Sequence, residues 1–202
     1  MISTPNVTPG NARLGPILPR RFYDRVTVEV ARELLGKVMV HGATGGIIVE
    51  TEAYLGLDDQ ASHAFRGITP RSKVMFGPPG HAYVYFIYGM YECINVVTER
   101  DGKAGAVLIR ALEPLFGIDL MQVRRPGAKR LRDLASGPGK LTLAMGITRS
   151  LNGADFTHGS LVIRDRRDAQ PFEIVAGPRI GITRCADWPL RFTIAGSEFV
   201  SK

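Results

Sequence analysis

Short apolar runs separated by glycine and proline predict a mixture of strands and helices from about position 19 onward. Strands are expected over 38–40, 46–53, 82–88, 91–98, 104–112, and near 160–164, 172–177 and 190–195. Helices are expected over 27–35, 58–65, 114–124 and 138–145. Thr27 is placed to cap the first helix and Gly36 to end it.

The order of these elements indicates the fold class. Strands and helices follow one another without the regular βαβ alternation of parallel sheets, which favours an α+β domain around a curved, mostly antiparallel sheet with surrounding helices. Almost nothing separates 82–88 from 91–98, so these strands predict a protruding β-hairpin. Residues 1–18 are rich in Pro, Gly, Asn, Ser and Thr and are expected to form a disordered tail. Residues 19–202 are expected to form one domain.

Charge narrows the range of partners. The 26 Lys and Arg residues outnumber 19 Asp and Glu residues, giving a net charge of +7. Such an excess favours a polyanion as partner, because neutralised phosphates release counterions. Many small proteins are equally basic, so charge alone leaves simple solubility as an alternative. No apolar run suits a membrane span and no signal sequence is evident, which predicts an intracellular protein.

Cysteine and histidine spacing gives no sign of a metal site. Cys93 and Cys185 stand far apart, with no Cys-x-x-Cys pair. The histidines are scattered without ligand spacing, at His41, His63, His81 and His158. We therefore expect neither a metal nor a disulfide framework.

The strand at 46–54 carries candidate chemistry. Alternation puts Ile47, Val49, Thr51 and Ala53 on a core face, and the opposite face then receives Ile48, Glu50, Glu52 and Tyr54. Two carboxylates and an aromatic ring could line a pocket, to which His63 could return. The alternative is a solvated face, which this segment alone favours.

The hairpin turns through Tyr88, Gly89, Met90 and Tyr91 instead of the usual Asn-Gly or Asp-Gly. Bulky apolar side chains at a hairpin tip are exposed to water unless they insert into something. Proteins that kink DNA insert such wedges between base steps from the minor groove. The alternative is that another part of the fold covers the tip; the basic charge favours the wedge.

Arg110 alternates onto an apolar face of the strand 104–112, and a buried guanidinium needs a partner. Either a carboxylate, such as Glu113 or Glu52, or a phosphate would serve. Five positive charges lie within 124–132, and the segment SGPGK at 136–140 opens a helix whose free amides could bind an anion. An exposed, solvated loop is the alternative for both segments.

Several unusual strings occur together and in order: VETEAYLG (49–56), ASH (61–63), TPR (69–71), YVYFIYGMY (83–91), Asn95, LIRALEP (108–114) and SGPGKL (136–141). Through them the chain resembles the alkyladenine (3-methyladenine) DNA glycosylase family from about Leu18 to the C-terminus. The length of 64–67 differs from animal members and is similar to bacterial ones, and the basic loop 124–132 matches no family motif. The resemblance implies a cytoplasmic enzyme that acts on the chromosome.

The resemblance also implies roles for individual residues. Glu52 matches the general base that deprotonates the attacking water, and His63 and Arg110 match residues that hold this water and a nearby phosphate. The remaining implied roles are an aromatic box (Tyr54, His63, Tyr85), exclusion of the guanine amino group (Asn95), filling of the gap in the duplex (Tyr88, with Met90 and Tyr91 beside it) and contacts to the DNA backbone (Arg71, Lys140).

The resemblance implies a monofunctional glycosylase that flips alkylated or deaminated purines out of duplex DNA. The expected class includes 3-methyladenine, 7-methylguanine, hypoxanthine and ethenoadenine. Neither a metal nor a cofactor is expected, and the enzyme is expected to be a monomer. An unperturbed glutamate titrates at about 4.3, so Glu52 should be ionised at neutral pH and should need no large pKa shift to serve as the base. A non-enzymatic minor-groove binder and a hydrolase of free nucleosides remain alternatives.

Overall fold

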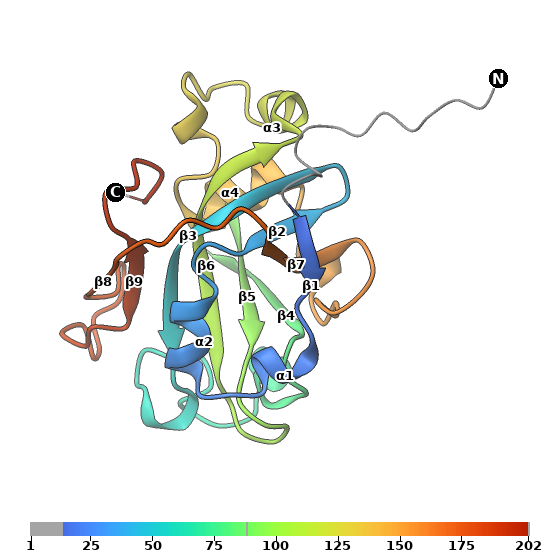
Figure 1. Cartoon of the computed structure of the whole chain (residues 1–202). Helices are drawn as coiled ribbons and strands as arrows, with labels where there is room; N and C mark the ends of the chain where they lie inside the picture. The colour runs from blue at the N-terminus through green and yellow to red at the C-terminus, as the bar shows by residue number, and fades with distance from the viewer. Residues whose placement is uncertain (1–13, 88, 202) are drawn as a thin grey trace.

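A computed structural model describes residues 14–87 and 89–201. These residues contain one antiparallel sheet with the strand order β1-β7-β2-β3-β6-β5-β4, from which β9 pairs with β3 and β8 with β9 (Figure 1). The strands are β1 Leu14–Ile17, β2 Val38–His41, β3 Thr44–Tyr54, β4 Ala82–Ile87, β5 Tyr91–Val97, β6 Ala106–Phe116, β7 Leu161–Arg166, β8 Ile174–Gly177 and β9 Arg191–Ile194. The predicted α+β fold with a mostly antiparallel sheet is confirmed.

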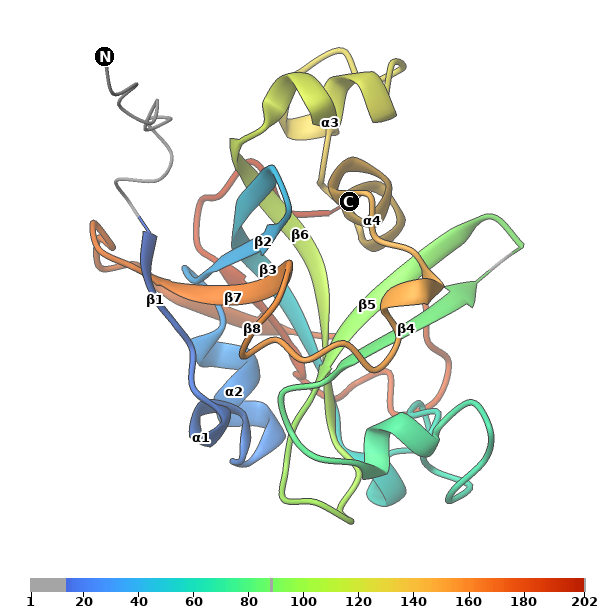
Figure 2. The same ribbon diagram turned by 90° about the vertical axis from the view of Figure 1, so that its right-hand side faces the viewer.

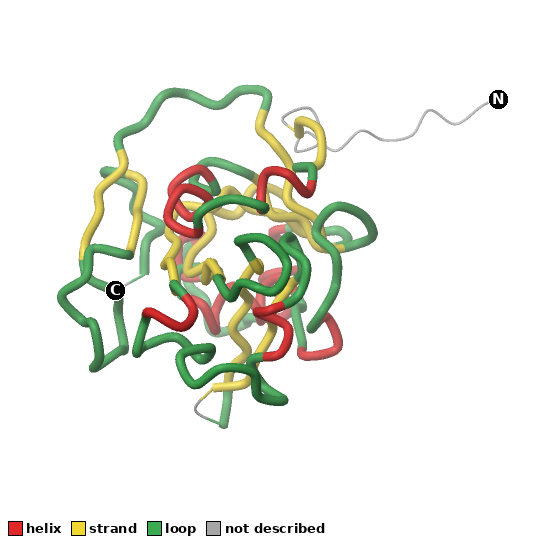
Figure 3. Tube along the Cα trace, turned by 90° about the horizontal axis from the view of Figure 1, so that it is seen from below, coloured by secondary structure: helices red, strands yellow, loops and turns green. Residues whose placement is uncertain are grey.

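The helices are short and lie around the sheet. They are α1 Arg20–Tyr23, α2 Thr27–Glu33, α3 Ile118–Arg124 and α4 Pro138–Met145, with 3-10 turns at Gly56–Asp58, Lys73–Phe76, Leu131–Asp133 and Arg149–Leu151. Helix α2 packs on β3, where the Thr51 hydroxyl donates to the carbonyl of Ala31, and α4 packs on β5 and β6. Figure 3 shows strands near the centre, with helices and loops around them. None of the described helices is long and apolar enough to cross a membrane.

The main core lies between α2 and the inner face of the sheet, where Leu34, Ile48, Ile94, Ile109 and Leu112 are fully buried. Strand β3 is buried on both faces almost throughout, because β6 and β9 pair with its edges and α2 and the loops cover it. Polar residues on this strand therefore lie inside the protein, and they need internal partners.

An irregularity in β3 changes which side chains share a face. Ile48 pairs with Leu112, Glu50 with Ala111 and Thr51 with Ile109, so an extra residue in β3 is followed at once by an extra residue in β6. Ile48 consequently packs in the main core, as Ala53 does. The prediction that Ile48 shares a face with Glu50 and Glu52 is wrong, because simple alternation does not continue through the irregularity, whereas Glu50 and Glu52 both contact Arg110.

Three predicted boundaries are also corrected. Residues 14–17, expected in the tail, form β1, which pairs with β7, whereas residues 1–13 lie outside the described part. Residues 58–65 form turns beyond the short 3-10 turn instead of a helix. Strand β6 continues through Pro114 to Phe116, and α3 begins after the left-handed Gly117.

Strand β6 can continue to Phe116 because its partner strand β3 has a glycine, Gly45, at the paired position. A Cβ on Gly45 would lie 2.4 Å from the Phe116 ring, so only glycine leaves room for this ring beside β3. The remaining predicted strands and the helices α2 and α4 are confirmed within a few residues. The predicted hairpin is β4–β5, which projects from the body of the molecule (Figure 2).

Candidate active site

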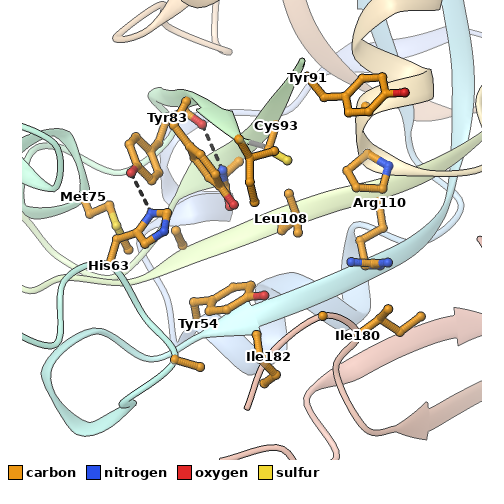
Figure 4. A pocket seen from close by; sticks show the side chains of 18 of the residues that line it. Tyr54, His63, Met75, Tyr83, Tyr91, Cys93, Leu108, Arg110, Ile180 and Ile182 are labelled. Atoms are coloured by element: carbon orange, nitrogen blue, oxygen red, sulfur yellow. Dashed lines mark hydrogen bonds between the residues drawn. The ribbon is translucent and has the colours of Figure 1, made fainter. Parts of the chain in front are cut away.

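A cavity of about 460 Å³ opens beside the hairpin, between β3, β4, β5 and β6 (Figure 4). Its lining comes from five segments: Tyr54 of β3; Gln60, Ala61 and His63 of the following loop; the hairpin residues Tyr83, Tyr85, Ile87, Tyr91, Cys93 and Asn95; Ala106, Leu108 and Arg110 of β6; and residues 180–184. Met75, Pro138 and Gly139 complete it. A cavity of this size is typical of a site for a small organic group.

Aromatic rings form one wall of the cavity. The centroids of His63 and Tyr85 are 4.6 Å apart with planes at 76°, and those of Tyr83 and Tyr85 are 5.2 Å apart. A hydrogen bond of 2.9 Å joins the Tyr83 hydroxyl to Nδ1 of His63. Burial, together with the charge of Arg71, lowers the pKa of His63 to about 4. His63 is therefore a neutral ring at physiological pH.

Tyr54 lies across the cavity from these rings (Figure 4). The guanidinium of Arg179 stacks on the Tyr54 ring, 4.6 Å from its centroid. Arg179 is held in turn by two hydrogen bonds to Asp59 and one to the carbonyl of Ala53, and the Arg179–Asp59 pair is fully buried. Arg179 therefore holds the Tyr54 ring in a fixed position, in which a flat ligand can stack on it.

Glu52 lies directly behind this wall and has no exposed surface. Its Oε2 accepts a hydrogen bond of 2.9 Å from the Tyr54 hydroxyl, and its Oε1 accepts one of 2.7 Å from the amide of Ile180. Nη1 of Arg110 lies 3.3 Å from the same Oε1. Glu52 does not line the cavity, whereas Tyr54, Arg110 and Ile180 do.

Burial raises the pKa of Glu52 above its usual value, and Arg110, the Ile180 amide and the Tyr54 hydroxyl oppose that rise only in part. The pKa of Glu52 therefore differs from that of an unperturbed glutamate, and the sequence alone gave no sign of this upward shift. The physical cause is the absence of water around Glu52, which disfavours the charged form.

Arg110 has carboxylate partners on β3. Its Nε donates to Oε1 of Glu50 at 2.9 Å, its Nη1 faces Glu52, and its Nη2 donates to the Ser201 hydroxyl at 3.2 Å. Of the two carboxylates suggested by the sequence, Glu52 is a partner, and Glu50 takes the place of Glu113. Arg110 also lines the cavity, where it can meet an anionic group.

Asn95 lies on the floor of the cavity beside Leu108, its neighbour across the β5–β6 pairing. Its Nδ2 donates to the carbonyl of Tyr83 at 3.0 Å, which fixes the orientation of the amide. Cys93 also lines the cavity, and burial raises the pKa of its thiol to about 11. The Cys93 side chain is hydrogen-bonded to Tyr85.

The hairpin tip presents Met90, whose exposed fraction is 65%, and Tyr91, whose exposed fraction is 39%. The Tyr91 ring packs against Gly139 at the start of α4, where an added Cβ would lie 2.7 Å from the ring. Tyr88 lies outside the described residues. Met90 therefore stays uncovered, and Tyr91 connects the tip to the rim of the cavity.

Comparison with known proteins agrees with this arrangement. Residues 21–198 match the family described as Methylpurine-DNA glycosylase (MPG). The chain belongs to the methylpurine-DNA glycosylase family. It is thereby a hydrolase of N-glycosyl bonds that acts on damaged DNA in base excision repair, and the resemblance drawn from the motifs is confirmed.

Curated relatives of this glycosylase share about half of its residues. Three of them have the name "Putative 3-methyladenine DNA glycosylase". The relative from Methanoculleus marisnigri is 54% identical over 92% of this chain and 98% of its own length. The relative from Methanocella arvoryzae is 53% identical over 93% and 96%, and that from Rhodopseudomonas palustris CGA009 is 54% identical over 94% and 90%.

The two residues that the motifs assign to the DNA backbone lie near the site of the glycosylase. Arg71 is exposed, with its guanidinium 5.0 Å from the centroid of the Tyr85 ring. Lys140 is exposed in the first turn of α4, next to Gly139. Both cations therefore flank the mouth that the hairpin forms.

The basic run 124–132 is partly structural. Arg124 donates to the carbonyl of Ala144 at 2.9 Å, and Arg125 donates to the carbonyl of Leu134 at 2.7 Å. These side chains tie α3 to α4 and to the loop between them. The interpretation of this segment as a free anion-binding surface is weakened accordingly.

Motif matching missed Asp59, Arg179 and the segment 180–184, and it gave no individual role to Tyr83 or Glu50, which lie within matched strings. The alternation of Tyr83 with Tyr85 was a usable signal. Asp59 and Arg179 are 120 positions apart, and nothing in the sequence pairs them. Within residues 14–87 and 89–201, no group of three or more His, Cys, Asp or Glu side chains could hold a metal ion.

Proposed function

We propose that this glycosylase flips an alkylated or deaminated purine out of duplex DNA into the aromatic cavity and hydrolyses its N-glycosidic bond with a water activated by Glu52. The expected range includes 3-methyladenine, 7-methylguanine, hypoxanthine and ethenoadenine. The observation that carries the proposal is the hydrogen bond between Glu52 and Tyr54, because it ties the buried carboxylate to the platform on which a base would stack.

The cavity walls support stacking of a flat, extruded base. Tyr54 lies across the cavity from His63 and Tyr83 (Figure 4), and Tyr85 packs against both of those rings, so a purine in the cavity would contact aromatic surface on both sides. Such stacking contributes about 1–3 kcal/mol per base. That gain offsets part of the few kcal/mol that unstacking costs, which is smallest for a mismatched or damaged base.

The cavity walls do not select for positively charged bases only. Two of the rings already carry an arginine on one face: Arg179 on Tyr54 and Arg71 on Tyr85. A cation on one face of a ring reduces its attraction for a second cation on the other face. This supports a range that includes neutral bases such as hypoxanthine as well as cationic alkylated purines.

Asn95 supports discrimination against undamaged guanine. Its amide is fixed on the floor of the cavity by the Tyr83 carbonyl. A guanine that entered would bring its amino group against this rigid side chain. Adenine-derived purines and hypoxanthine lack that group and so avoid the clash. 7-Methylguanine keeps the group, and its release would depend on the weaker glycosidic bond that alkylation produces.

Bond cleavage builds positive charge on the deoxyribose, and a nearby carboxylate stabilises that charge and accepts a proton from the attacking water. Arg110 holds Glu52 towards its ionised form from one side. In the free protein the Ile180 amide donates a hydrogen bond to Oε1 of Glu52. Water would therefore reach this oxygen when the irregular segment 180–184 moves away from it. His63, as a neutral ring, and Arg110 would border that water and the adjacent phosphate.

The same lining supports hydrolysis without strand cleavage. A lyase needs an amine nucleophile beside the sugar, and no lysine lines the cavity among the described residues. Water is then the nucleophile, and the product is an abasic site in an intact strand.

The hairpin tip would fill the gap in the duplex. Met90 is exposed and Tyr91 lies at the cavity rim, so both suit entry through the minor groove, and the sequence gives Tyr88 the place in the gap itself. Arg71 and Lys140 would contact phosphates on either side. The enzyme is proposed to act as a monomer, and turnover should require duplex DNA and fall steeply with salt.

Single-turnover incubation of Glu52→Gln with a duplex that carries one hypoxanthine tests the proposal. Release of free base should be abolished, while affinity for the lesion duplex is kept or increased. Glu113→Gln is the matched control, because Glu113 lies on β6 opposite β3, and it should release base normally.

Base release by Glu52→Gln at the wild-type rate would reject Glu52 as the base. Binding without any release by the wild-type protein would favour a non-enzymatic groove binder. Equal wild-type rates on free nucleosides and on the duplex would favour a nucleoside hydrolase.

A further inference from the structure

A second buried carboxylate lies behind Arg110. Glu50 has no exposed surface, and four donors surround it. Oε1 accepts from Nε of Arg110 at 2.9 Å, from Nε of Arg191 at 2.7 Å and from the Ser201 hydroxyl at 2.8 Å, and Oε2 accepts from the Ser201 amide at 2.6 Å. These four residues, Glu50, Arg110, Arg191 and Ser201, are called the Glu50 clamp below.

The clamp uses one edge of the Arg110 guanidinium and leaves another for Glu52. Nε binds Glu50, and Nη2 donates to the Ser201 hydroxyl at 3.2 Å. Nη1 is then directed to Glu52. Because a guanidinium is planar and rigid, fixing Nε and Nη2 also fixes the position of Nη1.

The pKa values of Glu50 and Glu52 shift in opposite directions, although burial acts to raise both. Burial alone would raise the pKa of Glu50, but the Ser201 amide, Arg110 and Arg191 hold it below its usual value. With fewer opposing contacts, burial leaves the pKa of Glu52 above its usual value. The two carboxylates therefore differ in role: one anchors Arg110 as a permanent anion, and the other is free to take up a proton.

We propose that Glu50 and Ser201 are positioning residues for base excision, which hold Arg110 in the orientation that keeps Glu52 ready to activate water. The inference rests on the proposed function of Glu52. It adds that β9 and the segment ending at Ser201 belong to the catalytic apparatus, although neither Glu50 nor Ser201 lines the cavity.

The clamp requires an anion at position 50. Each oxygen of Glu50 faces at least one donor and none faces an acceptor. In Glu50→Gln one of these oxygens becomes an NH2 group, which must then face another donor inside the protein. Arg110 and Arg191 also lose the negative charge that they share, which is a strongly destabilising change in a buried pair.

Ser201→Ala is the gentler test, because it removes only the hydroxyl that bridges Arg110 and Glu50. Single-turnover release from the hypoxanthine duplex should fall about tenfold, the size expected for one hydrogen bond to charged groups. Affinity for that duplex should change less than about twofold, since no cavity contact is lost. Ser201→Thr, which keeps the hydroxyl, should restore release.

The pH profile separates positioning from packing. Arg110 lowers the pKa of Glu52, so a loosened Arg110 should move the acid limb of the release rate to higher pH. The other groups that face Glu52 are unchanged in Ser201→Ala: Glu50, Tyr54, Cys93, Arg179 and the Ile180 amide. Ser197→Ala is the matched control, because the Ser197 hydroxyl accepts from the Phe199 amide and not from the clamp.

Glu50→Gln, if it folds, should lose release by on the order of 100-fold, because a misplaced Arg110 no longer orients Glu52. Wild-type release and an unshifted acid limb in Ser201→Ala would overturn the inference. Equal losses of release and duplex affinity, without rescue by Ser201→Thr, would also overturn it. Failure of the proposed function is seen separately, as release by Glu52→Gln at the wild-type rate.

Discussion

The Tyr54 hydroxyl donates a hydrogen bond of 2.9 Å to Oε2 of Glu52, two residues earlier on the same strand. The ring of Tyr54 faces the cavity, and the carboxylate that it binds lies behind the wall. A base that stacks on Tyr54 would therefore lie one hydrogen bond away from Glu52, the carboxylate proposed to activate water.

The acid limb of base release should reflect the raised pKa of Glu52. The proposed base works only when ionised, so release should fall as pH drops through a midpoint above 4.5, the ordinary value for a glutamate. Rates from single-turnover release between pH 4 and 8 measure it. His63→Gln should leave the midpoint in place, because the pKa of His63 is about 4. A midpoint at or below 4.5 would contradict the buried position of Glu52.

Asp59→Asn should destabilise the protein by about 3–5 kcal/mol, because it leaves the fully buried guanidinium of Arg179 without its counter-charge. Urea unfolding, followed by tryptophan fluorescence, measures the change in free energy of unfolding. The neighbouring Asp58→Asn is the control, because Asp58 is exposed and should change stability little. A loss of stability in Asp59→Asn as small as that in Asp58→Asn would contradict a stabilising role for the buried Arg179–Asp59 pair.

Met90→Ser should weaken binding to a lesion duplex, because an exposed apolar side chain at the hairpin tip would no longer enter the minor groove. The expected loss is about 1–2 kcal/mol for one apolar side chain. Fluorescence anisotropy with lesion and undamaged duplexes separates this loss from non-specific affinity, which should change little. Tyr88→Ser, predicted from the sequence, should act in the same direction, and equal losses on both duplexes would contradict both roles.

Arg71→Met should favour cationic lesions over neutral ones, because the Tyr85 ring is released from a guanidinium 5.0 Å from its centroid. In a Glu52→Gln background, the affinity for 7-methylguanine relative to hypoxanthine should rise about two- to fivefold. Arg71→Lys keeps the charge and should keep the ratio closer to wild type. Arg66→Met, which removes a nearby exposed cation, is the matched control. A ratio that moves equally in Arg66→Met would indicate a long-range effect of charge alone.

Sequence patterns predicted those parts of the fold well that depend on residues close together in the sequence. The hairpin β4–β5 and the helix α4 came from local signals, namely adjoining apolar runs and Pro138 at a helix start. The strand through Pro114 was mistaken for a helix start, since only the facing Gly45 reveals that there is room for Phe116.

The site was predictable where a motif holds it together and not where distant segments meet. Glu52 and Tyr54 share a motif, and their contact follows from it. The contact of Arg110 with Glu50 was missed because neither segment shows by itself that β3 pairs with β6. Ser201 lies 151 positions from Glu50, so only the folded chain brings their side chains together.

The matched irregularities at positions 49–50 of β3 and 110–111 of β6 have a consequence for the evolution of this strand. Deleting one residue there from β3 alone would exchange the two faces of the strand beyond it, so that Thr51 and Ala53 would point at the cavity while Glu52 and Tyr54 would enter the hydrophobic core beneath α2. Variants with an altered length between 48 and 51 should be lost even when every side chain is retained. The exposed stretch 167–171 between β7 and β8 can lengthen or shorten freely.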